Sequence, residues 1–317
     1  MRRFEVISKF FLALASSVVI FLSGFAIPPL GVILLPFVVQ PVLIYGVKYG
    51  MAGGLGVLCF ALLLLVFFAG EAMAFIYAIF ALMAGLLFGL LGRLKVIEYL
   101  VVGVSAALLS ITASALLYFF GSWSAMLQEF RQSVSQQIEL AVRMHEKLGF
   151  PAESLGVLKE RAPHMIEMVL QLLPGLVFLS LAFMVLINIM FLCRRFPERR
   201  AQWLSLTSLR EWKGPEPLVW VLIACGFSLF IPGLEAGHAA ALNLLLIIGA
   251  CYFAQGLAVI AYFFHKNKVP RFLRGITYVL IVFQQIFTLL VVGLGLFDLW
   301  GNFRRLGKDN LTPSQAA

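Results

Sequence analysis

Amide and phenol side chains interrupt a long apolar stretch, Asn243–Phe264, towards the C-terminal end of the chain. Gln255 lies near the middle of this stretch, and helical spacing places Tyr252 and Tyr262 on the same face. Polar groups are costly in hydrocarbon, so such groups either line a polar cavity or join neighbouring helices through hydrogen bonds worth about 0.6–2 kcal/mol. The first arrangement binds a small molecule, and the second only stabilises a helical bundle.

The next apolar stretch carries a second polar group near its midpoint. Gln284 and Gln285 are adjacent there, and Thr288 follows Gln284 by one helical turn. We expect this stretch to pack against the Gln255 face. A polar cavity enclosing Gln255 and Gln284 would favour ligand binding, whereas direct bonds from these amides to neighbouring helices would favour a scaffold.

A third polar set lies where predicted helices meet the outer membrane edge. Asn243 is separated from Gln255 by about 18 Å at 1.5 Å per helical residue, so one small ligand cannot touch both. Glu71, Glu235, His238 and Asn243 are candidates for the lining of an outward-facing mouth. Because charges at membrane edges cost little, simple hydration of these side chains is the alternative.

Motifs for catalysis or metal binding are absent from the sequence. It has no HExxH, GxSxG or Walker A motif and no pair of intramembrane aspartates. The four cysteines have no CxxC or Cys/His spacing and are interpreted as small apolar residues of packed helices. We therefore expect no enzyme activity, no cofactor and no bound metal.

The composition indicates a protein whose solvent is the lipid bilayer. Of 317 residues, 62% are hydrophobic and only 12% are charged, against roughly 25% charged in soluble domains. The net charge of +9 does not indicate nucleic-acid binding, because the basic residues cluster in loops between apolar runs. This pattern is typical of a bacterial inner-membrane protein with basic cytoplasmic loops.

Apolar runs of about 17–25 residues predict an all-α bundle of eight or nine transmembrane helices. They form one membrane domain, residues 1–303, followed by a polar tail, 304–317. The candidate spans are 10–27, 30–47, 51–69, 72–91, 96–120, 170–193, 217–232, 239–264 and 276–297. The second and seventh are short and contain or abut prolines, so either is a candidate broken or re-entrant segment. The first resembles a signal peptide, but Pro28 and Pro29 and the later spans favour an uncleaved helix.

The distribution of Lys and Arg predicts a cytoplasmic N-terminus. This orientation places the basic loop 194–213 inside. Four of its side chains form a candidate surface for cytoplasmic partner proteins: Arg194, Arg195, Arg199 and Arg200. Nine spans would place Arg304 outside, against the rule, so the side of the C-terminus is left open.

The segment 121–169 is a polar insert between two spans. Met126, Phe130, Val134 and Ile138 recur at helical spacing, and Gly149-Phe150-Pro151 then breaks the pattern. We expect an outer amphipathic helical hairpin, either a cap on the membrane domain or a surface for a partner.

Glycines at GxxxG spacing predict close helix packing early in the chain. They are Gly46, Gly50 and Gly54, followed by Gly85 and Gly89.

Three blocks of sequence carry a family resemblance. The first is Pro41-x-x-x-Tyr45-x-x-x-Tyr49-Gly50. The second joins Leu173-Pro174-Gly175 to Arg194-Arg195, Glu211-Trp212 and Pro217-Leu218-Val219-Trp220. The third runs from Asn243 through Tyr252-x-x-Gln255-Gly256-Leu257-Ala258-Val259 to Asp298 and Arg304. In this order they resemble the YybS-like family of bacterial membrane proteins, whose function is unknown.

The resemblance implies a more distant similarity to the substrate-binding S components of energy-coupling-factor transporters, and more remotely to the rod-shape scaffold protein MreD. S components bind a vitamin or metal ion from outside and depend on partner ATPases. This chain has more spans, a large insert and no ATPase motif. Two hypotheses follow, a transporter-type subunit that binds a small molecule of unknown identity and a scaffold for other membrane or cytoplasmic proteins; an intramembrane enzyme is a remote third.

Overall fold

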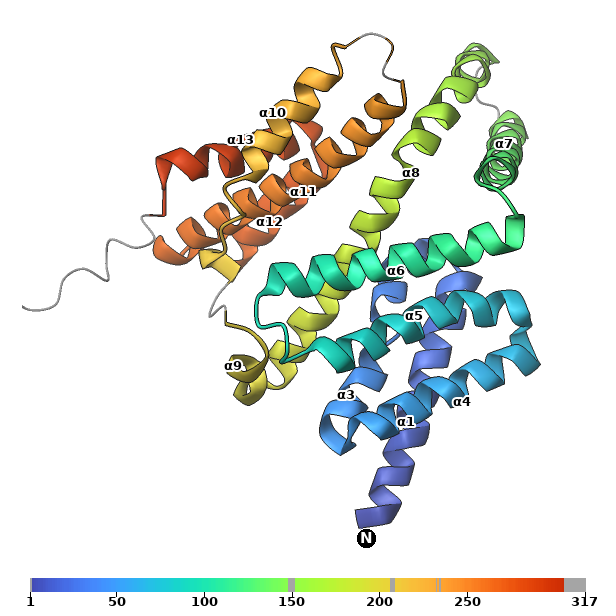
Figure 1. The fold of residues 1–317 in the computed structure, drawn as a ribbon, viewed down its shortest axis with the longest axis vertical. Helices are drawn as coiled ribbons and strands as arrows, with labels where there is room; N and C mark the ends of the chain where they lie inside the picture. Colours follow the sequence, from blue (N-terminus) through green and yellow to red (C-terminus); the bar gives the residue numbers. More distant parts are fainter. Residues whose placement is uncertain (1, 148–151, 206–208, 232, 234, 305–317) are drawn as a thin grey trace, which may run out of the picture. The chain divides into compact units, whose positions relative to one another are not determined.

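The computed structural model describes residues 2–147, 152–205, 209–231, 233 and 235–304 (Figure 1). Over this part of the chain every regular element is helical, apart from an isolated bridge between Leu91 and Leu94. By length and composition, seven helical stretches of the described chain can cross a membrane, with Pro29–Tyr49 counted as one stretch. The number rises to eight if one bent pair of helices also counts as a single span. The all-α prediction is confirmed.

The chain forms two compact units, and each is described by itself. Unit 1 comprises Met1–Met126 and Ser180–Ser205. Unit 2 comprises Leu127–Leu179 and Leu206–Ala317. The long helix α8 (Ala152–Arg195) contributes its last part to unit 1 and its first part to unit 2.

Unit 1 is built from apolar helices joined by short turns (Figure 1). In order they are α1 (Arg2–Ala26), α2 (Pro28–Leu34), η1 (Leu35–Phe37), α3 (Gln40–Tyr49), α4 (Met51–Ala69), α5 (Glu71–Leu90) and α6 (Ile97–Phe120), and then, after α8, η2 (Pro197–Arg199) and α9 (Arg200–Trp203). Gly50, with φ +116°, makes the turn from α3 to α4, a conformation that L side chains rarely adopt.

Two of the early glycines make room for an aromatic ring in unit 1. A Cβ atom on either Gly46 or Gly54 would overlap the ring of Phe88 on α5. Gly85 and Gly89 behave differently, because a Cβ atom on either meets nothing within 4 Å. Of the two predicted GxxxG sets, only the first therefore contributes to close helix packing, through Gly46 and Gly54.

Unit 2 contains the polar hairpin and the last helices. They are α7 (Trp123–Lys147), the first part of α8, η3 (Leu209–Glu211), α10 (Leu218–Ser228), α11 (Glu235–Lys266), α12 (Arg271–Phe283) and α13 (Gln285–Gly301). The side chains of Ile248, Tyr252, Val259 and Val291 are buried in its core. At 11 residues, α10 is too short to cross a bilayer alone.

The helices of the insert differ from an independent hairpin in one respect. Its first helix is α7, but its second continues through Pro163 and Pro174 into the apolar run that follows, as one helix of 44 residues. A salt bridge of 2.6 Å between Arg131 and Glu167 joins the two helices. The predicted break at 149–151 lies outside the described residues.

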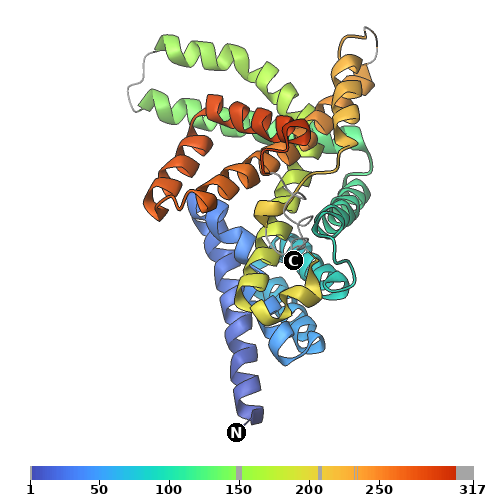
Figure 2. The same ribbon diagram turned by 90° about the vertical axis from the view of Figure 1, so that its left-hand side faces the viewer.

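The last apolar run does not form a straight span. α12 and α13 meet at Gln284 with a bend of 103°, and Figure 2 shows the corner between the orange-red and red helices. Gln284 is extended, with φ −110° and ψ 108°, and the hydroxyl of Thr288 donates to the carbonyl of Ile281 across the corner. Gln284 and Gln285 are exposed there.

Candidate functional site

A buried ion pair lies at the C-terminal end of unit 2. Arg304 Nη2 donates to Asp298 Oδ2 at 2.6 Å, and the two side chains are 0% and 2% exposed. Arg304 Nη1 also donates to the carbonyl oxygens of Arg210 and Trp212, at 2.7 and 2.8 Å. The guanidinium thus joins the residues that follow α13 to residues 210–212, at η3.

Gln255 connects this ion pair to helix α11. Its Nε2 donates to Asp298 Oδ2 at 3.2 Å, and its Oε1 accepts from the backbone N–H of Gly214 at 3.1 Å. Its side chain is 0% exposed. We call Gln255, Asp298, Arg304 and the backbone of 210–214 the C-terminal network. Gln255 therefore bonds directly to neighbouring elements and does not line a polar cavity in the described structure.

The local sequence explains why Arg304 returns to Asp298. Asn302 ends α13 in the left-handed conformation with φ 38°, which Asn tolerates better than most residues. The chain therefore reverses, and the N–H of Phe303 donates to Asp298 Oδ1 at 3.1 Å. Both carboxylate oxygens of Asp298 accept hydrogen bonds.

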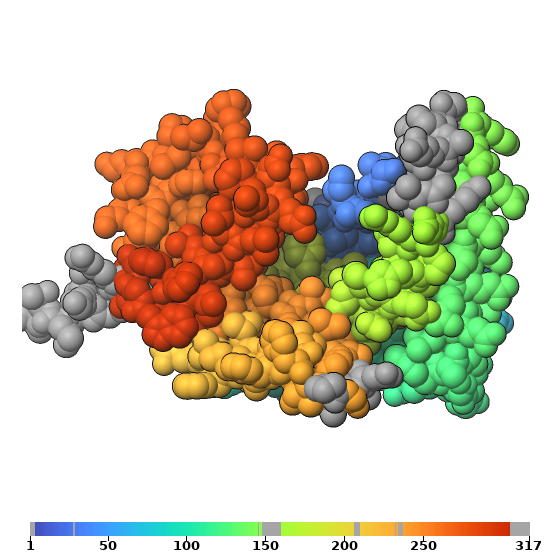
Figure 3. All heavy atoms as spheres, turned by 90° about the horizontal axis from the view of Figure 1, so that it is seen from above, coloured from blue at the N-terminus to red at the C-terminus, as the bar shows by residue number. Residues whose placement is uncertain are grey.

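Close backbone contact between α11 and α13 positions the network. A Cβ atom on Gly256 would overlap the carbonyl of Val291, and one on Gly295 would overlap the carbonyl of Tyr252. Glycine at both positions lets the helices approach until Gln255 reaches Asp298. α13, red in Figure 3, exposes other side chains, including Ile286, Leu289 and Phe297.

Tyr252 belongs to the same face as Gln255, as the sequence spacing predicts. Its side chain is 2% exposed, and its hydroxyl has no hydrogen-bond partner among the described residues. Tyr262 is half-buried. The structure does not bring Gln284 or Gln285 into the C-terminal network, because both are exposed at the corner between α12 and α13.

Asn243 joins two helices within unit 2. Its Oδ1 accepts from the N–H of Gly175 at 2.6 Å, and its Nδ2 donates to the carbonyl of Gln171 at 2.7 Å. An undisturbed α-helix pairs these two backbone groups with each other, so the amide inserts into α8 next to Pro174. Both the oxygen and the nitrogen of the Asn243 amide are therefore bonded to α8, although the sequence suggested that this side chain lines an outward-facing mouth.

The candidate mouth residues are divided between the two units. Glu71 is exposed in the first turn of α5 and belongs to unit 1, whereas Glu235, His238 and Asn243 belong to unit 2. His238 Nε2 bonds the carbonyl of Ile231 at 2.9 Å. The side chain of Glu235 lies outside the described residues.

The four arginines of the candidate partner surface differ in their surroundings. Arg194 and Arg195 are exposed at the end of α8. Arg199 Nη1 donates to the carbonyl of Val47 at 3.0 Å, so it ties η2 to α3. Arg200 is half-buried. Arg194 and Arg195 are therefore the two that combine an exposed side chain with no hydrogen bond to another helix of unit 1 in the described structure.

The second apolar span of unit 1 is interrupted where sequence reasoning placed a possible break. α2 ends at Leu34 and α3 begins at Gln40, and the carbonyls between them receive side-chain donors. Ser17 Oγ donates to Val38 O, and Asn188 Nδ2 donates to Pro36 O, both at 2.7 Å. We call Ser17, the backbone of 35–39, Gln40 and Asn188 the interrupted span site.

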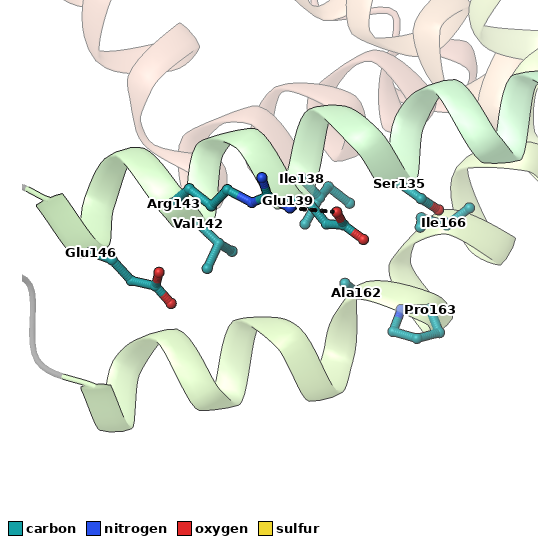
Figure 4. A pocket seen from close by; sticks show the side chains of 9 residues that line it. All are labelled: Ser135, Ile138, Glu139, Val142, Arg143, Glu146, Ala162, Pro163 and Ile166. Atoms are coloured by element: carbon teal, nitrogen blue, oxygen red, sulfur yellow. Dashed lines mark ion pairs between the residues drawn. The ribbon is translucent and has the colours of Figure 1, made fainter.

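A groove of about 490 Å³ lies between α7 and the first part of α8. Figure 4 shows Ile138, Val142 and Ile166 among its lining side chains, with Glu139 and Arg143 paired at 3.6 Å along α7. It is open, and its polar lining consists of Ser135, Glu139, Arg143 and Glu146. No cluster of three His, Cys, Asp or Glu that suits a metal ion occurs in the described ranges.

Sequence reasoning missed the partnership of Asp298 and Arg304 and the participation of Gln40 and Asn188. The sequence marked Asp298 only as a residue that carries the family resemblance, and it placed Arg304 in a polar tail. Each of the two amides stands in an otherwise apolar run, which is a signal that could have identified them.

The C-terminal network yields a prediction about topology. Because Arg304 bonds the carbonyls of Arg210 and Trp212, we expect the C-terminus to emerge on the same side of the membrane as the basic loop. Fusions of green fluorescent protein and of alkaline phosphatase after Ala317 should therefore give the same pattern of fluorescence and phosphatase activity as fusions after Lys213. Phosphatase activity after Ala317 but not after Lys213 would contradict this placement.

Comparisons with known proteins place the chain in a family. A family model described as "Predicted membrane protein (DUF2232)" matches residues 15–299. The chain is also 25% identical over 297 residues to "Uncharacterized protein YybS" of Bacillus subtilis (strain 168), covering 88% of this chain and 90% of that protein. No solved structure gives a significant match. The predicted resemblance to YybS-like proteins is confirmed, and the chain belongs to the DUF2232 family of predicted membrane proteins.

Proposed function

We propose that this multi-pass membrane protein is a scaffold that recruits partner proteins on the cytoplasmic side of a bacterial inner membrane. The observation that carries the proposal is the direct bonding of Gln255 to Gly214 and Asp298. The amide acts as a bridge between elements of unit 2, which supports a structural use of the intramembrane polar groups.

Asn243 supports the same interpretation. Its amide is used at both ends to hold α11 against α8 within unit 2. The polar side chains that the sequence offers for ligand binding therefore serve helix association in two separate places. Rigid helices with satisfied polar groups suit a protein that presents a surface to others.

Arg194 and Arg195 are the strongest candidates for that surface. Both are exposed at the end of α8, and the Arg195 guanidinium lies 5.8 Å from the centroid of the Phe196 ring. Arg guanidinium groups recognise carboxylates with two parallel hydrogen bonds. The expected partner therefore presents acidic side chains to this end of the helix.

The double variant Arg194→Gln/Arg195→Gln tests the surface. Exposed charge pairs are worth up to about 1 kcal/mol each, so losing two should weaken partner binding roughly tenfold. Recovery of cross-linked partners with a tagged chain, compared by quantitative mass spectrometry, measures the effect. Arg199 and Arg200 stay unchanged because Arg199 holds Val47 and Arg200 is half-buried.

The matched control is Arg271→Gln, which removes another exposed basic side chain, at the start of α12. We expect its partner recovery to equal that of the wild type. Equal recovery from the double variant and the wild type would show that this surface does not recruit partners.

A transporter-type subunit that binds a small molecule is the second candidate function. The interrupted span favours it, because broken helices are a common construction of substrate and ion sites in transporters. Thermal shifts of the purified protein with a panel of vitamins and cofactors test this candidate. A complete lack of shifts, together with no retained small molecule, would count against it.

A further inference from the structure

The interruption of the second span has a covalent cause. Proline has no backbone N–H, so Pro36 and Pro41 cannot donate to the carbonyls of Val32 and Phe37, as helix geometry would require. The chain consequently passes from α2 through η1 to α3 with its hydrogen-bond ladder broken. Within this stretch, side chains of other helices donate to the carbonyls of Pro36 and Val38.

The break lies deep within unit 1. It falls near the middle of the apolar helical stretch Pro29–Tyr49, and Val38 and Val39 are fully buried. Leu34, Leu35, Val38 and Val39 keep right-handed helical dihedral angles, so it is the hydrogen-bond ladder that is interrupted here. Backbone groups left over at such depth are tolerated only where protein or a water-filled cavity surrounds them. The described neighbours include three buried polar side chains from other helices: Ser17, Tyr77 and Asn188.

The hydrogen atoms at the break can be assigned by elimination. Ser17 Oγ donates its single hydrogen to Val38 O, so the 2.8 Å contact with Tyr77 is donated by the tyrosine hydroxyl. Asn188 Nδ2 donates to the carbonyls of Pro36 and Met184, at 2.7 and 2.8 Å. Because carbonyls only accept, this fixes the orientation of the Asn188 amide.

Two amide oxygens are left at the break without a donor among the described residues. They are Asn188 Oδ1, on a side chain that is 0% exposed, and Gln40 Oε1, on a side chain that is 7% exposed. Asn188 binds the carbonyl of Pro36, and Gln40 lies one helical turn after Pro36. Both oxygens therefore belong to the same part of unit 1.

Neutral oxygens in this setting suit a monovalent cation. Amide and carbonyl oxygens are hard ligands, which alkali and alkaline-earth ions prefer over the N and S ligands of transition metals. Divalent ions in proteins are usually held by carboxylates, and no described carboxylate takes part in the interrupted span site. Neutral oxygen ligands in a dry interior can therefore balance the charge of a monovalent cation better than that of a divalent cation.

We propose that the interrupted span site binds an alkali cation, Na⁺ or K⁺, with Asn188 Oδ1 and Gln40 Oε1 as side-chain ligands. Backbone carbonyls of 35–39 supply further oxygens. Binding holds α1, α3 and α8 together at the break, so the cation stabilises unit 1. The site is independent of the C-terminal network and of the arginine surface.

The test is thermal unfolding of the full-length protein in nanodiscs at constant ionic strength. Choline chloride is replaced stepwise by sodium chloride or potassium chloride. We expect a saturating rise in Tm for wild type with one of the two cations, and the two series identify which. Equal Tm in choline, sodium and potassium would overturn the proposal.

Gln40→Met is the decisive variant. It keeps the length of the side chain and removes the amide oxygen, which has no hydrogen-bond partner in the described structure. We expect the variant to fold and to lose the cation-dependent rise in Tm. Gln285→Met, which removes an exposed amide from α13, should keep the full rise. The same rise in Gln40→Met as in the wild type would contradict the assigned ligand.

Gln40→Glu provides a second arm if Gln40→Met does not fold. A carboxylate at this place binds cations more strongly and is costly when unpaired. The proposal predicts a larger rise in Tm than in the wild type, and a new response to Ca²⁺. A variant that responds to neither ion would show that this position does not face a cation.

Discussion

Replacing Asp298 by asparagine is expected to lower the free energy of unfolding by about 3–5 kcal/mol, the usual loss when one partner of a buried ion pair is removed. Both oxygens of the Asp298 carboxylate accept hydrogen bonds, from Arg304 and Gln255 on one side and from the N–H of Phe303 on the other. An asparagine has one amide oxygen and one NH₂ group. In either orientation its NH₂ group would face an N–H donor that now bonds a carboxylate oxygen. Arg304 would then remain buried without a counter-charge. Unfolding of the purified protein in mixed micelles measures the effect.

Two controls separate this effect from a general sensitivity to charge loss. Glu139→Gln removes a carboxylate whose pair with Arg143 is 68–70% exposed, and should cost at most about 1 kcal/mol. The double variant Asp298→Leu/Arg304→Met removes both charges and should be more stable than Asp298→Asn. If Asp298→Asn is as stable as Glu139→Gln, the ion pair does not anchor the end of the chain.

The helices themselves follow from the apolar runs of the sequence. A membrane forces backbone groups to bond within each segment, so run length alone predicts most helices of the described chain. α4, for example, spans Met51–Ala69, the same residues as the predicted span. The interruption near Pro36 was also foreseeable, because proline acts through its own covalent structure.

The corner at Gln284 was not predictable in the same way. Apart from Gln285 and Thr288 the neighbouring residues are apolar, and no proline or glycine marks the bend. The corner accompanies the close packing of α13 on α11 through Gly256 and Gly295, a contact between distant parts of the sequence. A pattern within one run gives no information about such a contact.

The same reasoning applies to the polar side chains. The sequence identified Gln255 and Asn243 as unusual, since amides are rare in apolar runs. It did not identify Gly214 or Gly175 as their backbone partners, which lie 41 and 68 residues away. Whether an intramembrane amide binds a ligand or another helix depends on such partners, so the distinction required the structure.

The glycine contact between α11 and α13 yields the second large effect. Gly295→Ala places a Cβ atom onto the backbone carbonyl of Tyr252, and no rotamer change can relieve an overlap with backbone. The helices must separate, and we expect a loss of about 3 kcal/mol, the upper end of the usual range for overpacking. Because Gln255 reaches Asp298 only while the helices are close, the C-terminal network should weaken as well.

The chain provides a matched control two residues away on the same helix. A Cβ atom on Gly293 meets nothing within 4 Å, so Gly293→Ala adds the same methyl group without an overlap. Alanine favours the helix over glycine by up to about 1 kcal/mol, so this variant should be as stable as the wild type or more stable. Thermal unfolding of both variants measures the difference. Equal stability of Gly293→Ala and Gly295→Ala would mean that α11 and α13 are not in backbone contact, and the position of the C-terminal network would then need another support.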